Sequence, residues 1–382
     1  MTQTSILTND LQVHIAKAIG AAGGWLGFDD FMALALYTPG LGYYANDSLK
    51  FGLMPAGAHG LKGAGSDFVT APELSPRFGQ TLARQVAQAL QASATAEVWE
   101  FGAGSGALAL QILDTLGPEI ERYTIVDLSG SLRARQRERL AVHGAKVRWA
   151  TELPAEMRGV VLGNEVLDAM PVKLLMRLNG VWHERGVVAA SLEAPQGRFI
   201  YADQLTALRP PLEVPGQQDY LTEIHPQAEG FIRTLADRLK VGAVFLLDYG
   251  FPEHEYYHPQ RSMGTVMCHR NHLVDADALA DVGLKDITAH VNFTGIALAG
   301  QEAGLAVAGY TSQGRFLLNC GLLDGMENSS LSERAMVQKL VNEHEMGELF
   351  KVIAFATGKL KNPDGTAWEP LGFNAGDRTH TL

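Results

Sequence analysis

The stretch "EFGAGSGALA" at residues 100–109 decides the fold, because its glycines separate an apolar run from a segment of helical spacing. The apolar residues around the glycines are Val98, Trp99 and Phe101 on one side and Leu108, Leu110, Ile112 and Leu113 on the other. A strand, a glycine-rich turn and a helix in this order form the first unit of a doubly wound α/β sheet. Glycine permits the sharp turn and lets a ligand lie against the backbone.

Glycine spacing alone leaves the ligand of this turn open. Gly102, Gly104 and Ala107 match the dinucleotide pattern G-x-G-x-x-G/A. With Gly106 in place of Ala107, the same turn matches G-x-G-x-G equally well. The choice between ligands therefore has to come from the residues around the glycines.

Glu100 favours S-adenosylmethionine over a dinucleotide. A dinucleotide would place its pyrophosphate over the turn, where a nearby carboxylate costs on the order of 1 kcal/mol or more at an effective dielectric constant of about 20. S-Adenosylmethionine instead carries an ammonium and a sulfonium and has no phosphate. Asp127 ends the next predicted strand, where an acidic side chain accepts ribose hydroxyls, and Leu128 follows it. We therefore predict a cofactor site for S-adenosyl-L-methionine that contains Glu100, Gly102, Gly104, Gly106, Asp127 and Leu128, and we disfavour an NAD-dependent oxidoreductase.

Composition limits the class of protein and its partners. The chain has 382 residues, which at roughly 150 residues per domain suggests two or three units or one embellished core. Its 46% hydrophobic and 19% charged residues are typical of a soluble globular enzyme. The formal net charge of −11 argues against nucleic acid or an anionic membrane as the main partner.

The cysteines and the apolar runs indicate the compartment. Cys268 and Cys320 lie far apart and form no C-x-x-C pair, which argues against a disulfide framework and favours a reducing compartment. The first residues, "MTQTSILTND", lack a signal-peptide pattern, and no apolar run reaches the about 18 residues that a membrane helix needs. We expect a cytoplasmic protein with no membrane insertion.

The chain divides into an N-terminal cap and a core. Residues 1–93 are predicted to form a helical and loop cap over the cofactor site, including a long loop that we interpret as packed and functional. Residues 94–382 are predicted to form the core, with an antiparallel insertion at about 172–226 and a helical insertion at about 297–347. The predicted core strands lie at 97–101, 123–129, 146–150, 159–172, 242–250, 286–293 and 350–356.

"GNEVLDAMP" follows the fourth predicted strand, so its polar residues lie at the sheet edge where open α/β folds bind ligands. Glu165 and Asp168 are candidate catalytic residues, because carboxylates can hold a cationic acceptor and take up its proton. Asn164 is a candidate for positioning it. The alternative is structural: Asp168 caps the following turn and Glu165 holds a backbone amide.

A second motif, "HEYYH" at residues 254–258, matches the zinc-protease pattern H-E-x-x-H only in its letters. A zinc protease carries this motif on a helix, so that both imidazoles share one face. Pro252 and Pro259 bracket the motif and leave no room for such a helix. We therefore predict no metal site.

Seven motifs together resemble one family. In chain order these are "TPGLGYY", "DFVTAPELSPRFG", "EFGAGSG", "GNEVLDAMPV", "DYG", "DITAHVNF" and "MGELFKVIAFA", and they are similar to those of the MidA-type family over nearly the whole chain. The resemblance implies a class I methyltransferase with a Rossmann-like, seven-stranded sheet and S-adenosylmethionine as donor. It also implies that the "TAPE" loop, with Thr70, Pro72 and Glu73, lies at the cofactor.

The mitochondrial members of this family are complex I assembly factors that methylate an arginine. The resemblance therefore implies a methyltransferase with a protein acceptor, arginine in a respiratory complex I subunit if these members are the guide. However, nothing in this chain resembles the paired-glutamate loop of ordinary protein arginine methyltransferases. A small-molecule methyltransferase and a non-catalytic assembly protein that keeps the cofactor fold stay open, as does the oligomeric state.

Overall fold

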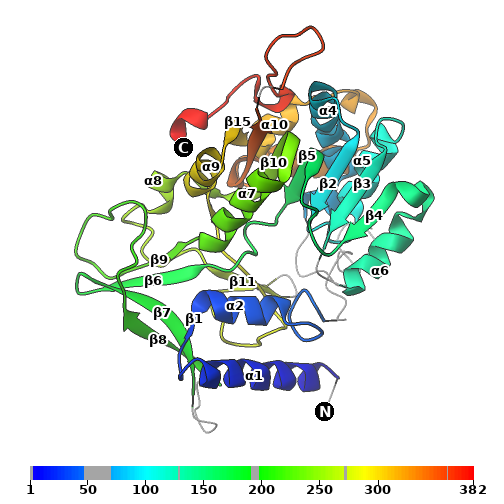
Figure 1. Cartoon of the computed structure of the whole chain (residues 1–382). Coiled ribbons are helices and arrows are strands. Elements are labelled where there is room, and N and C mark those ends of the chain that lie inside the picture. The colour runs from blue at the N-terminus through cyan, green and yellow to red at the C-terminus, as the bar shows by residue number, and fades with distance from the viewer. Residues whose placement is uncertain (1–2, 47–69, 128–129, 191–197, 271–272, 359) are drawn as a thin grey trace.

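A central β-sheet with helices around it forms the upper part of the molecule in Figure 1. The computed structural model describes residues 3–46, 70–127, 130–190, 198–270, 273–358 and 360–382. Within them the strands of this sheet follow the order β15-β16-β10-β5-β2-β3-β4, and a short strand, β14, pairs with β10. Their bounds are β2 Glu97–Phe101, β3 Arg122–Val126, β4 Val147–Ala150, β5 Met157–Asn164, β10 Leu239–Phe251, β14 Val291–Asn292, β15 Leu305–Ser312 and β16 Phe350–Thr357.

Strands β10, β5, β2, β3 and β4 run parallel, and β16 runs antiparallel to both of its neighbours. The α/β class predicted from the glycine stretch is therefore confirmed. Parallel strands end together, so the residues that follow β2, β3, β5 and β10 meet at one edge of the sheet.

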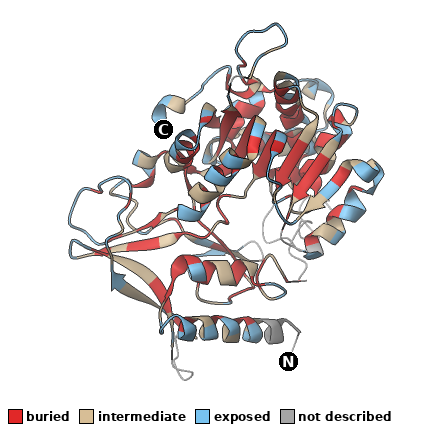
Figure 2. Ribbon diagram, viewed as in Figure 1, coloured by how far each residue is buried: buried red, intermediate tan, exposed pale blue. Residues whose placement is uncertain are grey.

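Helices cover both faces of the sheet, and the strands are buried between them (Figure 2). Along β2, Val98 packs with α4 and α5, whereas Trp99 and Phe101 pack on the opposite face with α7 and α9, because successive side chains of a strand alternate. The helices are α4 Pro76–Ser93, α5 Ala107–Leu116, α6 Gly130–Arg139, α7 Pro226–Arg238, α9 Phe293–Glu302, α10 Gln313–Asn319, α11 Leu331–Val341 and α12 Met346–Leu349.

A smaller antiparallel sheet lies below the main one in Figure 1. It has the order β1-β7-β6-β9, with β8 beside β7. Asn179 and Gly180, both at positive φ, form the turn between β6 and β7. Helices α1 and α2 pack on this sheet through an apolar cluster that includes Ile15, Phe31 and Val187. The bounds are α1 Gln3–Ala21, α2 Phe28–Tyr37, β1 Leu26–Gly27, β6 Lys173–Leu178, β7 Val181–Ala189, β8 Phe199–Leu205 and β9 Tyr220–Ile224.

A third sheet has the order β12-β11-β13, and its strands are β11 Met267–Arg270, β12 Leu273–Asp275 and β13 Asp286–Thr288. The remaining elements are short: α3 Ala71–Leu74, α8 Glu253–Tyr256, and the 3₁₀ turns Ala141–Lys146, Met326–Asn328, Leu371–Phe373 and Thr379–Thr381. No helix in the described parts of the chain is long and apolar enough to cross a membrane.

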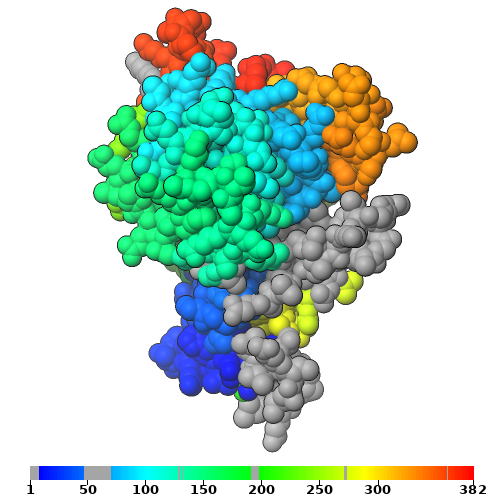
Figure 3. Space-filling view, turned by 90° about the vertical axis from the view of Figure 1, so that its right-hand side faces the viewer, coloured from blue at the N-terminus to red at the C-terminus, as the bar shows by residue number. Residues whose placement is uncertain are grey.

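The structure corrects three predictions. The segment 286–293 is not one strand of the main sheet, because β13 pairs with β11 and only β14 reaches β10. The edge strand is instead β15, inside the insertion predicted to be helical, where "LAVAGYTS" pairs with β16. Helix α4 packs on the core sheet, so the cap ends before residue 93. In Figure 3 the N-terminal residues, in dark blue, lie below the core. Most of the loop interpreted as packed and functional, residues 47–69, lies outside the described residues.

Candidate active site

The glycine turn after β2 has the open backbone that a bound nucleoside needs. Gly102, Gly104 and Gly106 have φ of +62°, +53° and +82°, a region that favours glycine. A Cβ on Gly104 would meet no heavy atom of the described residues within 4 Å, whereas one on Gly102 would lie 3.0 Å from Val166 Cγ2. The space beside Gly104 is therefore open, and a side chain there would fill it.

Gln136, which the sequence analysis did not identify, connects this turn to Asp127. Its Nε2 donates to the Gly104 carbonyl at 2.9 Å and to Asp127 Oδ2 at 2.8 Å. Trp149 Nε1 donates to Gln136 Oε1 at 2.9 Å, which orients the amide. The Asp127 carboxylate thus lies at the end of β3 next to the glycine turn, where the residues present fit an adenosine with a ribose diol. Leu128, the neighbouring predicted residue, lies outside the described residues.

Glu100 lies at the predicted position on β2, and its surroundings raise its pKa. It is buried, and the Tyr123 hydroxyl donates to its Oε2 at 2.8 Å. Burial raises the pKa of Glu100 to about 8, against the opposing effect of that hydrogen bond. Burial therefore favours the neutral carboxyl group, and the electrostatic argument against a pyrophosphate is weaker than the sequence implies.

The "TAPE" loop forms α3 and is tied to the glycine turn. Ser105 Oγ donates to Glu73 Oε1, and Arg139 Nη1 donates to the same oxygen at 2.8 Å. Gln111 Nε2, on α5, donates to the Pro72 carbonyl at 2.7 Å. Glu73 and Pro72 therefore hold the loop beside the turn, and their direct contact with the cofactor stays a prediction.

Thr70 precedes α3 and is half-buried, and its side chain makes no capping hydrogen bond. Its carbonyl accepts hydrogen bonds from the backbone N–H groups of Glu73 and Leu74 at 3.0 Å. The backbone of Thr70 thus starts the helix, while its role toward the cofactor stays a prediction.

The motif after β5 contains a strained residue. Glu165 has φ of +53°, although it is not glycine, and its backbone N–H donates to the Leu247 carbonyl at 2.9 Å. Asn164 Nδ2 donates to Glu165 Oε1 at 3.0 Å. Backbone strain of this kind costs on the order of 1–3 kcal/mol and is concentrated at functional sites.

The Glu165 carboxyl group lies among other acidic groups. Its removal from water and the charge of Asp168 raise the pKa of Glu165 to about 8, while hydrogen bonds from Asn164 and from the Ala71 backbone oppose the rise. The Ala71 contact joins the motif after β5, which contains Glu165, to the "TAPE" loop. The predicted catalytic and cofactor residues are therefore brought together at one edge of the sheet.

Asp168 is almost fully buried, with 2% of its surface exposed. Burial raises the pKa of Asp168 to about 6, and a hydrogen bond with Tyr249 opposes the rise. Asp168 Oδ1 has no hydrogen-bond partner among the described residues. A buried oxygen without a partner is costly unless a ligand or water satisfies it.

Asp248 holds the backbone of the motif in place. Its Oδ2 accepts hydrogen bonds from the N–H groups of Val166, Leu167 and Asp168 at 3.1, 2.9 and 3.2 Å, and its Oδ1 accepts one from Tyr249 N–H. Asp248 lies on β10 next to Leu247, which pairs with the last residue of β5, so the adjacent parallel strand supplies the support. Asp168 and Glu165 also accept hydrogen bonds from backbone N–H groups, Asp168 from Ala169 and Glu165 from Ala71, so the structural alternative predicted from sequence stays open beside the catalytic one.

The "HEYYH" segment forms the single helical turn α8, with Tyr256 and Tyr257 buried and His254 exposed. His258 Nδ1 accepts a hydrogen bond from Gln260 N–H at 3.2 Å. No group of three or more His, Cys, Asp or Glu side chains within the described ranges is arranged to hold a metal ion.

Comparisons with known proteins agree with this geometry. The model of the family described as "Putative S-adenosyl-L-methionine-dependent methyltransferase" matches residues 81–311. A Burkholderia thailandensis protein crystallised with S-adenosyl-homocysteine is 46% identical, with a TM-score of 0.90, over 100% of this chain and 99% of that one. The zebrafish (Danio rerio) mitochondrial protein arginine methyltransferase NDUFAF7 is 26% identical over 91% of this chain and 87% of the relative. The Drosophila melanogaster homologue is 25% identical over 87% and 81%.

Proposed function

We propose, from the premise that this chain belongs to the MidA-type family of S-adenosyl-L-methionine-dependent methyltransferases, that its methyl acceptor is a protein side chain, namely arginine. Methyltransferase activity and the cofactor follow from the family. The acceptor is our inference, and the buried carboxyl groups of Glu165 and Asp168 beside the cofactor turn carry it. The names of the mitochondrial relatives support it.

The chemistry requires a cation to be held and a proton to be removed. When bound, S-adenosylmethionine supplies an electrophilic methyl group on a sulfonium. A guanidinium hydrogen-bonds to carboxylates through two parallel N–H groups, and each hydrogen bond to a charged group contributes about 1.5–3 kcal/mol. Arrival of a cation favours the ionised forms of Glu165 and Asp168. As the new N–C bond forms and the S–C bond breaks, one of these carboxylates accepts the proton that the nitrogen loses.

We further propose a cytoplasmic location and, following the relatives named as NDUFAF7, a subunit of respiratory complex I as the acceptor protein. Both free cysteines are buried, which is compatible with a reducing compartment. The negative net charge of the chain suits an acceptor segment that is basic.

The acceptor can be identified by labelling. The protein is incubated with radiolabelled S-adenosylmethionine and a cell lysate, and labelled proteins are hydrolysed to amino acids. We expect the label in methylated arginine, with none above background for Gly104→Val, which serves as the matched inactive control. Label in a small molecule or in another amino acid would reject the arginine proposal and leave the methyltransferase assignment intact.

A further inference from the structure

Hydrogen bonds and one aromatic stack join the loop that contains Asp168 to an acidic residue of the third sheet, Asp286. The Tyr44 hydroxyl lies 2.8 and 2.7 Å from the two carboxyl oxygens of Asp286. Tyr44 stacks on Tyr37, with ring centroids 5.6 Å apart and an angle of 18° between the planes. The Tyr37 hydroxyl donates to the Ala169 carbonyl at 2.7 Å. The aromatic pair therefore connects Asp286 to the residue that follows Asp168.

The return path runs through the segment after β13. Ala289 N–H donates to the Asp168 carbonyl at 2.9 Å, and Asp286 begins β13 three residues earlier in the chain. Two independent connections thus fix Asp286 relative to Asp168. They come from different parts of the molecule, the N-terminal segment and the third sheet.

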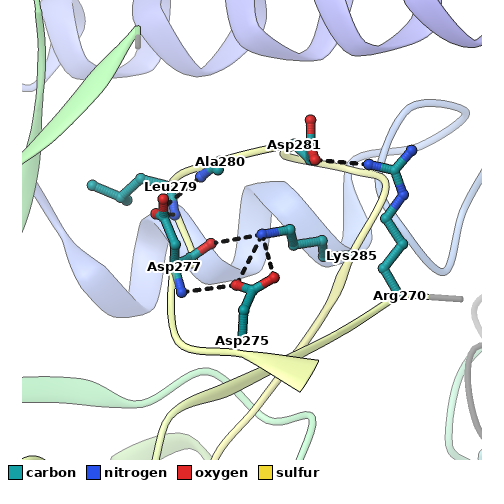
Figure 4. Close-up of polar contacts among 7 residues, drawn as sticks. All are labelled: Arg270, Asp275, Asp277, Leu279, Ala280, Asp281 and Lys285. Atoms are coloured by element: carbon teal, nitrogen blue, oxygen red, sulfur yellow. Dashed lines mark hydrogen bonds and ion pairs between the residues drawn. The ribbon is translucent and has the colours of Figure 1, made fainter. Parts of the chain in front are cut away.

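The loop before Asp286 is itself rigidly held (Figure 4). Lys285 Nζ donates to Asp275 Oδ1 at 2.9 Å and to the Asp277 carbonyl at 3.2 Å. Asp277 Oδ1 accepts from two backbone N–H groups of the same loop, and Arg270 pairs with Asp281 at 2.7 Å. The neighbouring lysine is therefore directed to Asp275, while Asp286 is directed to Tyr44.

The negative charge of Asp286, which is fully buried, acts on two neighbouring groups. The charge of Asp286 contributes to the raised pKa of Glu165. The charges of Asp286, Asp168 and Asp127 all contribute to the raised pKa of Tyr37, whose largest cause is burial. In the geometry, Tyr37 connects Tyr44, the partner of Asp286, to the Ala169 carbonyl next to Asp168. The buried Oδ1 of Asp168 has no hydrogen-bond partner among the described residues.

We propose that Asp286 is a specificity-determining residue of the acceptor site, which it completes from the side of the third sheet, and that Tyr44 positions its carboxylate. This inference rests on the proposed cationic acceptor. A guanidinium has five N–H donors, more than one carboxylate can accept. Glu165 and Asp168, which belong to the core, accept hydrogen bonds from some of these N–H groups, and Asp286 accepts hydrogen bonds from others. A neutral acceptor offers no charge to offset these acids, so Asp286 selects against it.

The test measures preference for a charged acceptor over a neutral one of the same shape. The probes are acetyl-Gly-Arg-Gly-amide and the same peptide with citrulline in place of arginine, titrated with S-adenosylhomocysteine present and followed by ligand-observed NMR. We expect the wild type to bind the arginine peptide more tightly than the citrulline peptide. The ratio of these two affinities should fall at least tenfold in Asp286→Asn and by a smaller, severalfold factor in Tyr44→Phe. S-Adenosylhomocysteine affinity should stay within twofold, as in the control Asp237→Asn, whose side chain is 71% exposed.

Each outcome decides between the proposals. If the wild type shows no preference for the arginine peptide, the cationic acceptor is wrong and this inference fails with it. If the wild type prefers arginine and Asp286→Asn keeps the same preference, only the role of Asp286 is wrong. Should Asp286→Asn no longer bind S-adenosylhomocysteine, Tyr44→Phe decides: an unchanged preference in that variant overturns the proposal, and a reduced one supports it.

Discussion

Gly104→Val tests the cofactor site sharply, because the chain contains a control glycine outside the site. Gly104 and Gly144 have φ of +53° and +56°, and a Cβ on either would meet no heavy atom of the described residues within 4 Å. Both substitutions strain a backbone of positive φ, and the ψ of −131° at Gly144 is one that residues other than glycine rarely adopt. Gly144 is exposed in the 3₁₀ turn Ala141–Lys146 and differs in having no predicted ligand.

The two variants should separate binding from stability. At Gly104 the new side chain occupies the open space beside the turn, so we expect S-adenosylhomocysteine affinity to fall at least a hundredfold, which corresponds to about 2.8 kcal/mol. At Gly144 we expect affinity within twofold of the wild type. Calorimetric titration measures the affinities, and thermal unfolding shows whether both variants lose similar stability. A folded Gly104→Val variant that binds S-adenosylhomocysteine as the wild type does would refute this location of the cofactor.

Three further predictions concern ligand choice and the acceptor edge. Calorimetry of the wild type should detect S-adenosylhomocysteine but not NAD, and tight NAD binding alone would contradict the cofactor assignment. Glu165→Gln and Asp168→Asn should keep donor affinity within about twofold while methyl transfer falls roughly tenfold or more, since 1.4 kcal/mol is a factor of ten; wild-type transfer by both would make these acids structural. Because the pKa of Glu165 is raised to about 8 and a cation needs its ionised form, kcat/KM should rise with pH up to about 8 and level off above it. A Glu165→Gln variant that retains this rise would assign it to another group.

The elements that the sequence predicts correctly are those in which neighbouring residues carry the signal. The strand, turn and helix around residues 97–116 follow from apolar spacing and from the glycines between them, whose positive φ other residues rarely adopt. The motif after β5 is found because a strand end places Glu165 and Asp168 at the ligand edge. In both cases the positions are set by the local chain.

The residues that sequence reasoning misses depend on contacts between distant segments. Gln136 and Arg139 lie in "SLRARQRERL", where hydrophobic periodicity does not distinguish the polar residues that face the turn. The segments 286–293 and 305–312 both contain apolar residues suited to strands, and only pairing with β11 or β16 separates them. The sequence identifies Glu100 as a carboxyl group beside the turn. Its burial against Tyr123, which raises the pKa, depends on the fold and could not be predicted.

The acceptor edge depends on the whole chain more than the cofactor turn does. The turn is fixed by β2, α5 and α6, which are close in sequence. The loop with Asp168 receives hydrogen bonds from Tyr37 at the end of α2 and from Ala289 after β13, both outside the main sheet. The supports from β10 act on the same motif, where the strained backbone at Glu165 lies. For the cationic acceptor that we propose, the cap and the third sheet contribute to binding through the backbone that carries Asp168, because they hold its carboxyl group in place.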